Sequence, residues 1–331
     1  MRQVTPSAPA PPAPWAILLA FTLVYLAWGT TYLAIREGVK QFPPGLFGGL
    51  RLTAAGLILF AFLALRGEPL RLRRRELFWV GLAGLLLFVG GNGLITVGER
   101  TVDSGVASIL VATTPLWMGF IEMFWPSGER LSARGWTGLL IGLAGVVLLL
   151  TPKLQHPAQF LQDVGPFLVL GSALSWSVGS LVLRRHRSRS HLAAAAYQMV
   201  LGGGVQTLIG LGMGEVTELT PEKFTPGAVY AFFHLLVVGS LIGFVAYNWL
   251  LGHVSATLAG TYAYVNPVIA VLVGGLWGEI IDGWVIGGMA VILAGVALVR
   301  TGAGGLPRQA EVEVGEEELD ETLLVAQEEV I

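Results

Sequence analysis

Long apolar stretches follow one another along nearly the whole 331-residue chain, separated by short polar segments. A hydrocarbon core about 30 Å thick requires about 20 apolar residues in one helix. We predict ten transmembrane helices, at Trp15–Ile35, Leu46–Leu65, Leu77–Val97, Val102–Trp125, Trp136–Thr151, Gly165–Leu183, Leu192–Met213, Ala228–Leu251, Val254–Trp277 and Trp284–Val299. This pattern is typical of an all-α polytopic membrane protein.

Charge placement predicts the orientation of these helices, because short cytoplasmic loops are enriched in Lys and Arg. With the N-terminus in the cytoplasm, 14 of the 20 Lys and Arg residues fall in inner segments and five in outer segments. Arg51 lies within a predicted helix. Both termini are therefore predicted to be cytoplasmic, which agrees with an even number of spans.

Composition excludes most soluble classes of protein. Apolar residues make up 54% of the chain and charged residues 13%, about half the roughly 25% typical of soluble domains. The mean hydropathy is +0.69, and the chain has no cysteine. These values argue against a soluble enzyme, a nucleic-acid-binding protein, a disordered chain and a disulfide-stapled secreted module.

The two ends of the chain are predicted to be tails. Residues 1–14 precede the first span, and residues 302–331 follow the last. Between Gly305 and Ile331 nine residues are acidic and one is Arg, with too little apolar surface to fold alone. We expect this acidic tail to be disordered, and a partner-binding role is the alternative.

An internal repeat divides the spans into residues 15–151 and 165–301, with five spans each. Three segments recur 148 to 152 residues later: Trp28-Gly29-Thr30 as Trp176-Ser177-Val178, Thr114-Pro115 as Asn266-Pro267, and Leu143–Val146 as Leu293–Val296. Because five is odd, the second copy must enter the membrane from the opposite side. Opposite charge bias in the aligned loops supports this inversion, a common architecture of secondary transporters.

Several short motifs occur in a specific order. They are Trp28-Gly29-Thr30-Thr31-Tyr32, Gly49-Leu50-Arg51-Leu52, Gly91-Asn92-Gly93, Ser104-Gly105-Val106-Ala107 leading to Thr114-Pro115, Tyr262-Ala263-Tyr264-Val265-Asn266-Pro267, and Gly278-Glu279. With this set the chain resembles the EamA family of the drug/metabolite transporter superfamily over residues 15–301. The resemblance implies ten helices, a central cavity, and export of amino acids, metabolites or drugs. One departure is Glu122, where the family usually has an uncharged residue.

Polar and aromatic residues within the spans are the candidates for substrate binding. Tyr262 and Asn266 share one helical face because four residues separate them. The full candidate set is Trp28, Arg51, Asn92, Thr114, Trp176, Asn248, Tyr262 and Asn266. Arg51 has the chemistry to hold a substrate carboxylate through two hydrogen bonds. The alternative for these residues is ordinary packing and hydrogen bonding between helices.

Two prolines and two titratable residues suggest roles in the transport cycle. Pro115 and Pro267 lie at equivalent places within spans, where each frees a backbone carbonyl and predicts a hinge. Glu122 and His234 are candidate proton-coupling residues. The alternatives are packed kinks for the prolines and structural contacts for the two side chains.

We expect a secondary active transporter that exports small solutes by alternating access, with no metal or cofactor. Its expected partners are a small-molecule substrate and the lipid bilayer, and no nucleic acid. Glycine stripes in the fifth and tenth spans fit packing within the chain, and a homodimer is the alternative. An importer, a facilitator and a channel are the competing functions. An intramembrane enzyme is disfavoured because the chain has no cysteine and no H-E-x-x-H or G-x-S-x-G motif.

Overall fold

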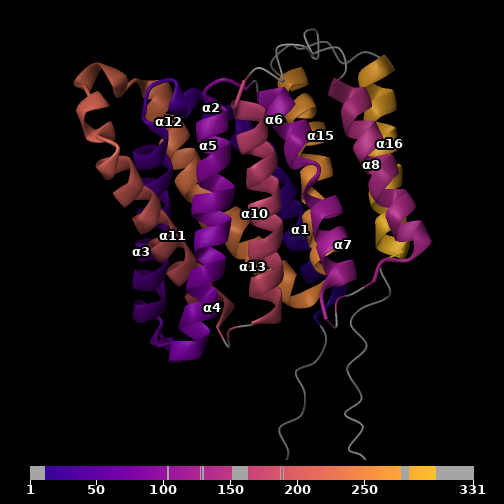
Figure 1. The fold of residues 1–331 in the computed structure, drawn as a ribbon, viewed down its shortest axis with the longest axis horizontal. Helices are drawn as coiled ribbons and strands as arrows, with labels where there is room; N and C mark the ends of the chain where they lie inside the picture. Colours follow the sequence, from indigo (N-terminus) through magenta and orange to yellow (C-terminus); the bar gives the residue numbers. More distant parts are fainter. Residues whose placement is uncertain are drawn as a thin grey trace, which may run out of the picture.

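The computed structural model describes residues 12–102, 104–126, 128, 130–150, 163–186, 188, 190–276 and 283–302, and every regular element in these ranges is helical (Figure 1). The first half of the chain contains α1 (Pro14–Gly29), α2 (Thr31–Val39), α3 (Pro44–Leu65), α4 (Arg74–Gly84), the π-helix η1 (Leu85–Gly93), α5 (Leu94–Gly98), α6 (Ser104–Val111), α7 (Thr114–Phe124) and α8 (Ala133–Leu150).

The second half follows a similar order, but it begins with one uninterrupted helix and adds two short 3₁₀ turns. It contains α10 (Gly165–Arg185), α11 (His191–Gly212), the turns η3 (Glu215–Glu218) and η4 (Pro221–Lys223), α12 (Pro226–His234), the π-helix η5 (Leu235–Phe244), α13 (Val245–His253), α14 (Ala256–Gly260), α15 (Tyr262–Leu276) and α16 (Gly283–Gly302). The predicted acidic tail lies outside the described residues.

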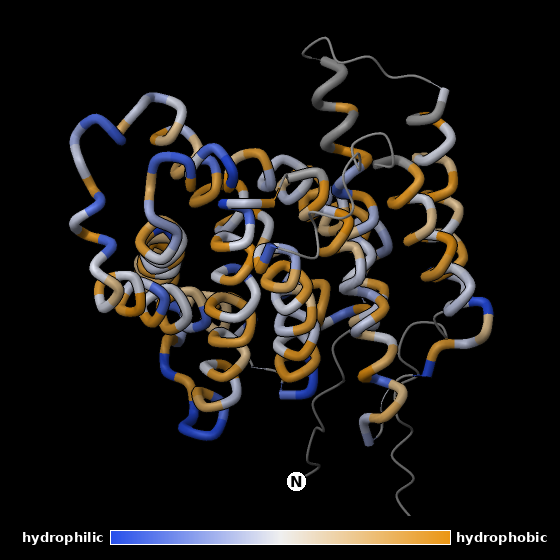
Figure 2. The backbone as a smooth tube through the Cα atoms, turned by 45° about the horizontal axis from the view of Figure 1, so that its top comes forward, coloured by the Kyte–Doolittle hydropathy of each residue, from blue (hydrophilic) through white to orange (hydrophobic). Residues whose placement is uncertain are grey.

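The predicted all-helical membrane architecture is confirmed. Seven described helical stretches are long and apolar enough to cross a membrane, and the shorter apolar helices Ala133–Leu148 and Ile286–Gly302 fall in the fifth and tenth predicted spans. Apolar backbone runs along the helices, and polar residues gather in the turns at their ends (Figure 2). Large exposed apolar side chains such as Leu18, Leu57 and Phe78 suit a lipid-facing surface.

Half of the predicted spans are interrupted in the structure, which the apolar pattern alone does not indicate. A break at Thr30 separates α1 from α2, and similar breaks separate α6 from α7 and α14 from α15. The third and eighth predicted spans instead contain the π-helices η1 and η5, which start 150 residues apart. The same irregularity at corresponding places in both halves supports the two-repeat layout.

Equivalent helices of the two halves pack against each other. In Figure 1, α8 and α16 stand side by side at one edge of the bundle, and α3 packs on α11 toward the other edge. Small residues permit this close approach. A Cβ atom added to Gly295 would lie 2.4 Å from the backbone nitrogen of Gly142, and one added to Gly203 would lie 2.7 Å from that of Thr53. The described glycines of α8 therefore pack within the chain.

A carboxylate holds the beginning of α3. Glu215 is buried in the turn after α11, and its oxygens accept hydrogen bonds from the backbone nitrogens of Gly45 at 3.1 Å and Leu46 at 2.8 Å. The first N–H groups of a helix have no partner within the helix, and the helix dipole favours a negative charge there. Glu215 therefore links the second span of the first half, α3, to the loop after α11 in the second half.

We predict that Glu215→Ala lowers the free energy of unfolding by about 1–3 kcal/mol, because one buried and one partly buried N–H group lose a charged acceptor. The measurement is the midpoint of thermal unfolding of the purified protein in detergent. Glu218→Ala is the matched control, because Glu218 forms a half-exposed ion pair with Arg100 at 3.5 Å and such pairs contribute little. Equal midpoints for the two variants would contradict the capping role.

Candidate functional site

A cavity of about 100 Å³ lies between the two halves of the chain, with room for several water molecules. Seven of the eight predicted binding residues line it: Trp28, Arg51, Asn92, Thr114, Trp176, Tyr262 and Asn266. They come from α1, α3, η1, α7, α10 and α15. The structure thus brings together residues that are up to 238 positions apart in the sequence.

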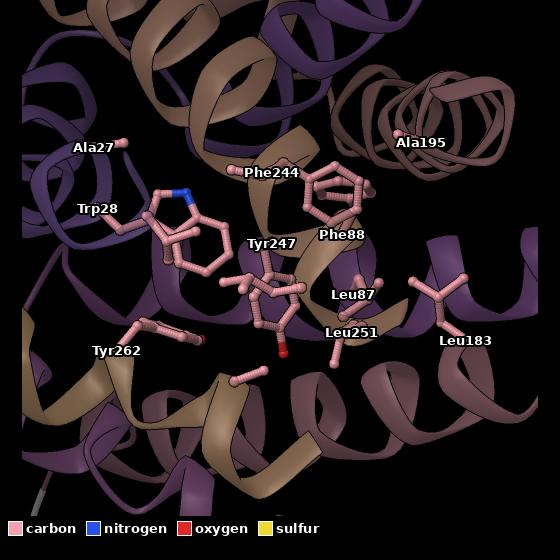
Figure 3. Close-up of a cluster of buried hydrophobic side chains, with 14 of the residues drawn as sticks. Ala27, Trp28, Leu87, Phe88, Leu183, Ala195, Phe244, Tyr247, Leu251 and Tyr262 are labelled. Carbon is pink, nitrogen blue, oxygen red and sulfur yellow. The ribbon is translucent and has the colours of Figure 1, made fainter. Parts of the chain in front are cut away.

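Aromatic side chains form one wall of the cavity. The Trp28 ring lies 4.6 Å from the Tyr262 ring, 5.0 Å from the Tyr247 ring and 5.4 Å from the Trp176 ring, measured between centroids. Trp28, Tyr247 and Tyr262 face one another in Figure 3, and Phe88 lies beside Phe244. These six residues define the aromatic cluster, and all of them except Tyr247 line the cavity.

Hydrogen bonds fix the two tryptophans of the aromatic cluster. The Trp28 indole donates to the backbone oxygen of Gly239 at 2.9 Å, and the Trp176 indole donates to the Tyr247 hydroxyl at 3.3 Å. Each indole also packs against a glycine in a π-helix of the opposite half. A Cβ atom at Gly243 would lie 2.6 Å from Trp28, and one at Gly91 would lie 2.8 Å from Trp176. The two halves therefore interlock through equivalent contacts.

Arg51 brings a buried positive charge to the cavity. Its side chain is 3% exposed and donates to Ser240 Oγ at 3.0 Å and to Asn92 Oδ1 at 2.9 Å. Both acceptors are neutral, and Nε has no hydrogen-bond partner. No carboxylate lies within ion-pair distance of Arg51 in the described part of the chain. A guanidinium in this state can accept an anionic group.

Two further polar side chains of the cavity lining have unsatisfied atoms. Asn266 is 1% exposed, and neither its amide oxygen nor its amide nitrogen has a hydrogen-bond partner. The Thr114 hydroxyl is also buried without a partner. Buried polar groups in proteins normally have a partner. Both side chains can therefore bind water or a ligand in the cavity.

Asn248 is the predicted binding residue that lies outside the cavity lining. Its amide donates to Gln198 Oε1 at 2.7 Å, and it borders a separate, much smaller pocket beside Arg184 and His191. The prediction that Asn248 lines the same cavity is therefore wrong. The physical reason is that Asn248 lies beyond the η5 π-helix, in α13, where its side chain faces α11.

The two predicted hinge prolines occupy different local structures. Pro115 stands in the first turn of α7, directly after the break that ends α6 at Val111. Pro267 lies inside α15, whereas the break in this span falls at Thr261. Their role as hinges stays a prediction.

Glu122 and His234 both have polar partners. Glu122 is 3% exposed and accepts two hydrogen bonds from Arg185, at 3.3 and 3.1 Å. The Arg185 guanidinium also lies 4.5 Å from the centre of the Trp125 ring. His234 Nε2 is 2.9 Å from Thr30 Oγ1. The Glu122–Arg185 pair joins α7 of one half to α10 of the other near the predicted inner end.

Comparison with known proteins identifies the family of this chain. The model of the EamA-like transporter family matches the chain twice, at residues 14–151 and 163–301. The chain belongs to the EamA-like transporter family. It is a multi-pass membrane protein and a transporter, as its relatives in this family are named.

Several members of the EamA-like family are similar over most of their length. The uncharacterized inner membrane transporter YedA of Escherichia coli K12 is 38% identical over 257 residues, which cover 77% of this chain and 80% of YedA. The uncharacterized transporter YoaV of Bacillus subtilis is 28% identical over 78% of this chain and 87% of its own length. The S-adenosylmethionine/S-adenosylhomocysteine transporter of Chlamydia trachomatis is 26% identical over 78% of this chain and 80% of its own length.

The fold also occurs in a solved crystal structure. That structure superposes with a TM-score of 0.70 at 23% sequence identity, over 89% of this chain and all of the other. At this identity the likeness shows the shared fold of the EamA-like chain and nothing about its substrate.

Sequence analysis missed Tyr247, Ser240 and Tyr32 in this EamA-like site. Ser240 and Tyr32 line the cavity, and Tyr247 is fully buried in the aromatic cluster. The signal for Tyr32 was present, because Tyr32 ends the first motif and is one helical turn from Trp28. Ser240 had no such signal, because the widened turn of η5 decides where its side chain points.

We predict that Arg185→Ala destabilises the protein by about 3–5 kcal/mol, because it removes a guanidinium and two hydrogen bonds from the buried Glu122 carboxylate. The double variant Glu122→Ala/Arg185→Ala should recover part of that loss, so that the two effects are not additive. The check is a double-mutant cycle on thermal unfolding in detergent. A double variant whose loss equals the sum of the single losses would show that the pair contributes no coupling.

Proposed function

We propose that this protein is a secondary active transporter that exports small metabolites, amino acids or drug-like solutes from the cytoplasm across a bacterial inner membrane. In this proposal ten helices span the membrane as two inverted repeats, with both termini cytoplasmic. The observation that carries the proposal is the cavity between the two halves, which contains a buried cation and unsatisfied polar groups. Substrate sites of secondary transporters lie at such repeat interfaces.

The position of the cavity supports an alternating-access cycle. Its lining includes Ile35, Arg51 and Ile95, which lie in the predicted outer half of the bundle. In this proposal the path toward the predicted inner side is closed by the aromatic cluster and by the Glu122–Arg185 pair, which both join the two halves. Opening inward would require separating these contacts between the halves while the outer ends of the helices come together.

The chemistry of the lining favours an amphipathic solute with an anionic group. Arg51 offers an unpaired Nε and a positive charge, and Asn266 offers an amide donor and acceptor. The rings of Trp28, Trp176 and Tyr262 provide an apolar wall on the other side. Ligand sites commonly combine an apolar lining with a few convergent polar groups.

We predict that export depends on Asn266. Cells that overproduce the protein should release a few solutes. Cells with an equal amount of the Asn266→Ala variant should release about tenfold less of them, since the amide offers two polar contacts of about 1 kcal/mol each. The measurement is mass spectrometry of the growth medium. Asn248→Ala is the matched control, because Asn248 is a buried asparagine outside the cavity lining. Identical profiles for all three proteins would contradict the proposed site.

We also predict that Arg51→Ala abolishes export of anionic or zwitterionic solutes while the variant still inserts into the membrane. The reason is that a charge-assisted hydrogen bond contributes about 1.5–3 kcal/mol, which Ala cannot replace. Release of these solutes and the amount of protein in the membrane fraction are measured together. Normal release by Arg51→Ala would show that the buried cation serves the fold alone.

A further inference from the structure

Three glutamates are buried in the described part of the chain, and their surroundings differ. Glu215 accepts two backbone hydrogen bonds, and Glu122 accepts two hydrogen bonds from Arg185. Glu99 is 3% exposed, and neither of its carboxylate oxygens has a hydrogen-bond partner. A buried carboxylate charge without hydrogen bonds is strongly unfavourable, whereas the neutral acid is tolerated far better. Glu99 is therefore the buried glutamate best suited to take up a proton.

Glu99 lies directly beside the cavity. It follows the last residue of α5, one helical turn after Ile95, which lines the cavity. Helix α2 packs against α5 and carries Tyr32, another lining residue. Tyr32 and Asn266 both line the cavity, and the negative charge of Glu99 acts on the Tyr32 hydroxyl. Tyr32 therefore connects the acid to the cavity that contains the unsatisfied amide.

The charged neighbours of Glu99 leave its protonation state free to change. Arg36, on α2, is the group whose positive charge favours ionised Glu99. On α3 the charged residue is Arg51, which donates to neutral acceptors. Asp163, before α10, accepts a hydrogen bond from the backbone nitrogen of Gly165. Arg100 forms its ion pair with Glu218 and not with Glu99. Burial therefore favours the neutral acid of Glu99, whereas the charge of Arg36 favours the carboxylate. A change in either the burial or the distance to Arg36 changes how readily Glu99 binds a proton.

We propose that Glu99 is the proton-binding site through which this transporter couples export to the proton gradient. In the outward-facing state the carboxylate takes up one proton from outer water, forming an O–H bond. In the inward-facing state that bond breaks, and the proton leaves through the Tyr32 side of the cavity to inner water. One proton moves inward per cycle, and no other covalent bond changes. The inference rests on the proposed export function.

The first test measures protonation without any substrate. Dicyclohexylcarbodiimide is an apolar reagent that modifies protonated carboxyl groups in apolar surroundings. The purified full-length protein in detergent is treated at about pH 6 and about pH 9, and its peptides are analysed by mass spectrometry. Both values lie above the pKa of an ordinary carboxyl group and below that of a lysine amine. We expect modification of Glu99 that falls several-fold at the higher pH and is absent in Glu99→Gln. An unmodified Glu99 at both pH values would overturn the proposal.

The second test measures coupling in cells with the medium-profile assay. Release by the wild-type protein should fall several-fold as the medium pH rises from about 6 to about 8, whereas Glu99→Gln should show weak release without pH dependence. Glu99→Asp should restore the pH dependence because it restores a carboxyl group. Glu218→Gln is the matched control, because Glu218 is a half-exposed acid at the same end of the bundle.

The outcomes separate the proton site from the transport function. Wild-type pH dependence in Glu99→Gln, at equal protein in the membrane, would overturn the proton site and leave the exporter intact. If the wild-type protein releases nothing, the export function fails, and the carbodiimide result alone decides whether Glu99 binds a proton reversibly. If Glu99→Gln does not reach the membrane, Glu99→Asp is tested in its place. Release that still depends on pH in Glu99→Asp supports the proton site, and release without pH dependence overturns it.

Discussion

The lipid bilayer offers no hydrogen bonds to an exposed backbone, and the rest of this structure depends on that constraint. Non-helical or widened backbone at membrane depth is tolerated where protein or water satisfies it. The interruptions at Thr30 and Thr261, the break before Thr114, and the π-helices η1 and η5 each adjoin or include residues of the cavity lining. The uninterrupted helices α3, α8, α11 and α16 form the supporting pairs. Irregular backbone is thus concentrated where the cavity needs polar groups.

The aromatic cluster shows how the two halves depend on each other. Trp28 fits against Gly243 of the other half, and Trp176 fits against Gly91 in the same way. A larger residue at either glycine would displace an indole ring whose N–H is already committed to a partner. This reciprocal fit joins the two halves at the cavity, where both tryptophans belong to the lining.

Buried charges in this protein fall into two groups. Glu215 and Glu122 are held by backbone N–H groups and by a guanidinium, so their negative charges are stabilised within the fold. Arg51 and Glu99 have no such counter-charge at hydrogen-bond distance in the described residues, and both lie at or beside the cavity. The first group serves assembly of the helices. The second group remains able to respond to a ligand or a proton.

The sequence by itself determined the membrane class, the all-helical architecture, the internal repeat and the family, because long apolar runs admit few alternatives in a bilayer. It also singled out seven of the residues that line the cavity, since polar and aromatic side chains stand out within apolar spans. Only the tertiary structure decided which of two buried asparagines, Asn248 or Asn266, faces the cavity. It alone revealed the isolated carboxylate of Glu99. Both depend on widened turns and on contacts between distant helices, which local sequence patterns do not encode.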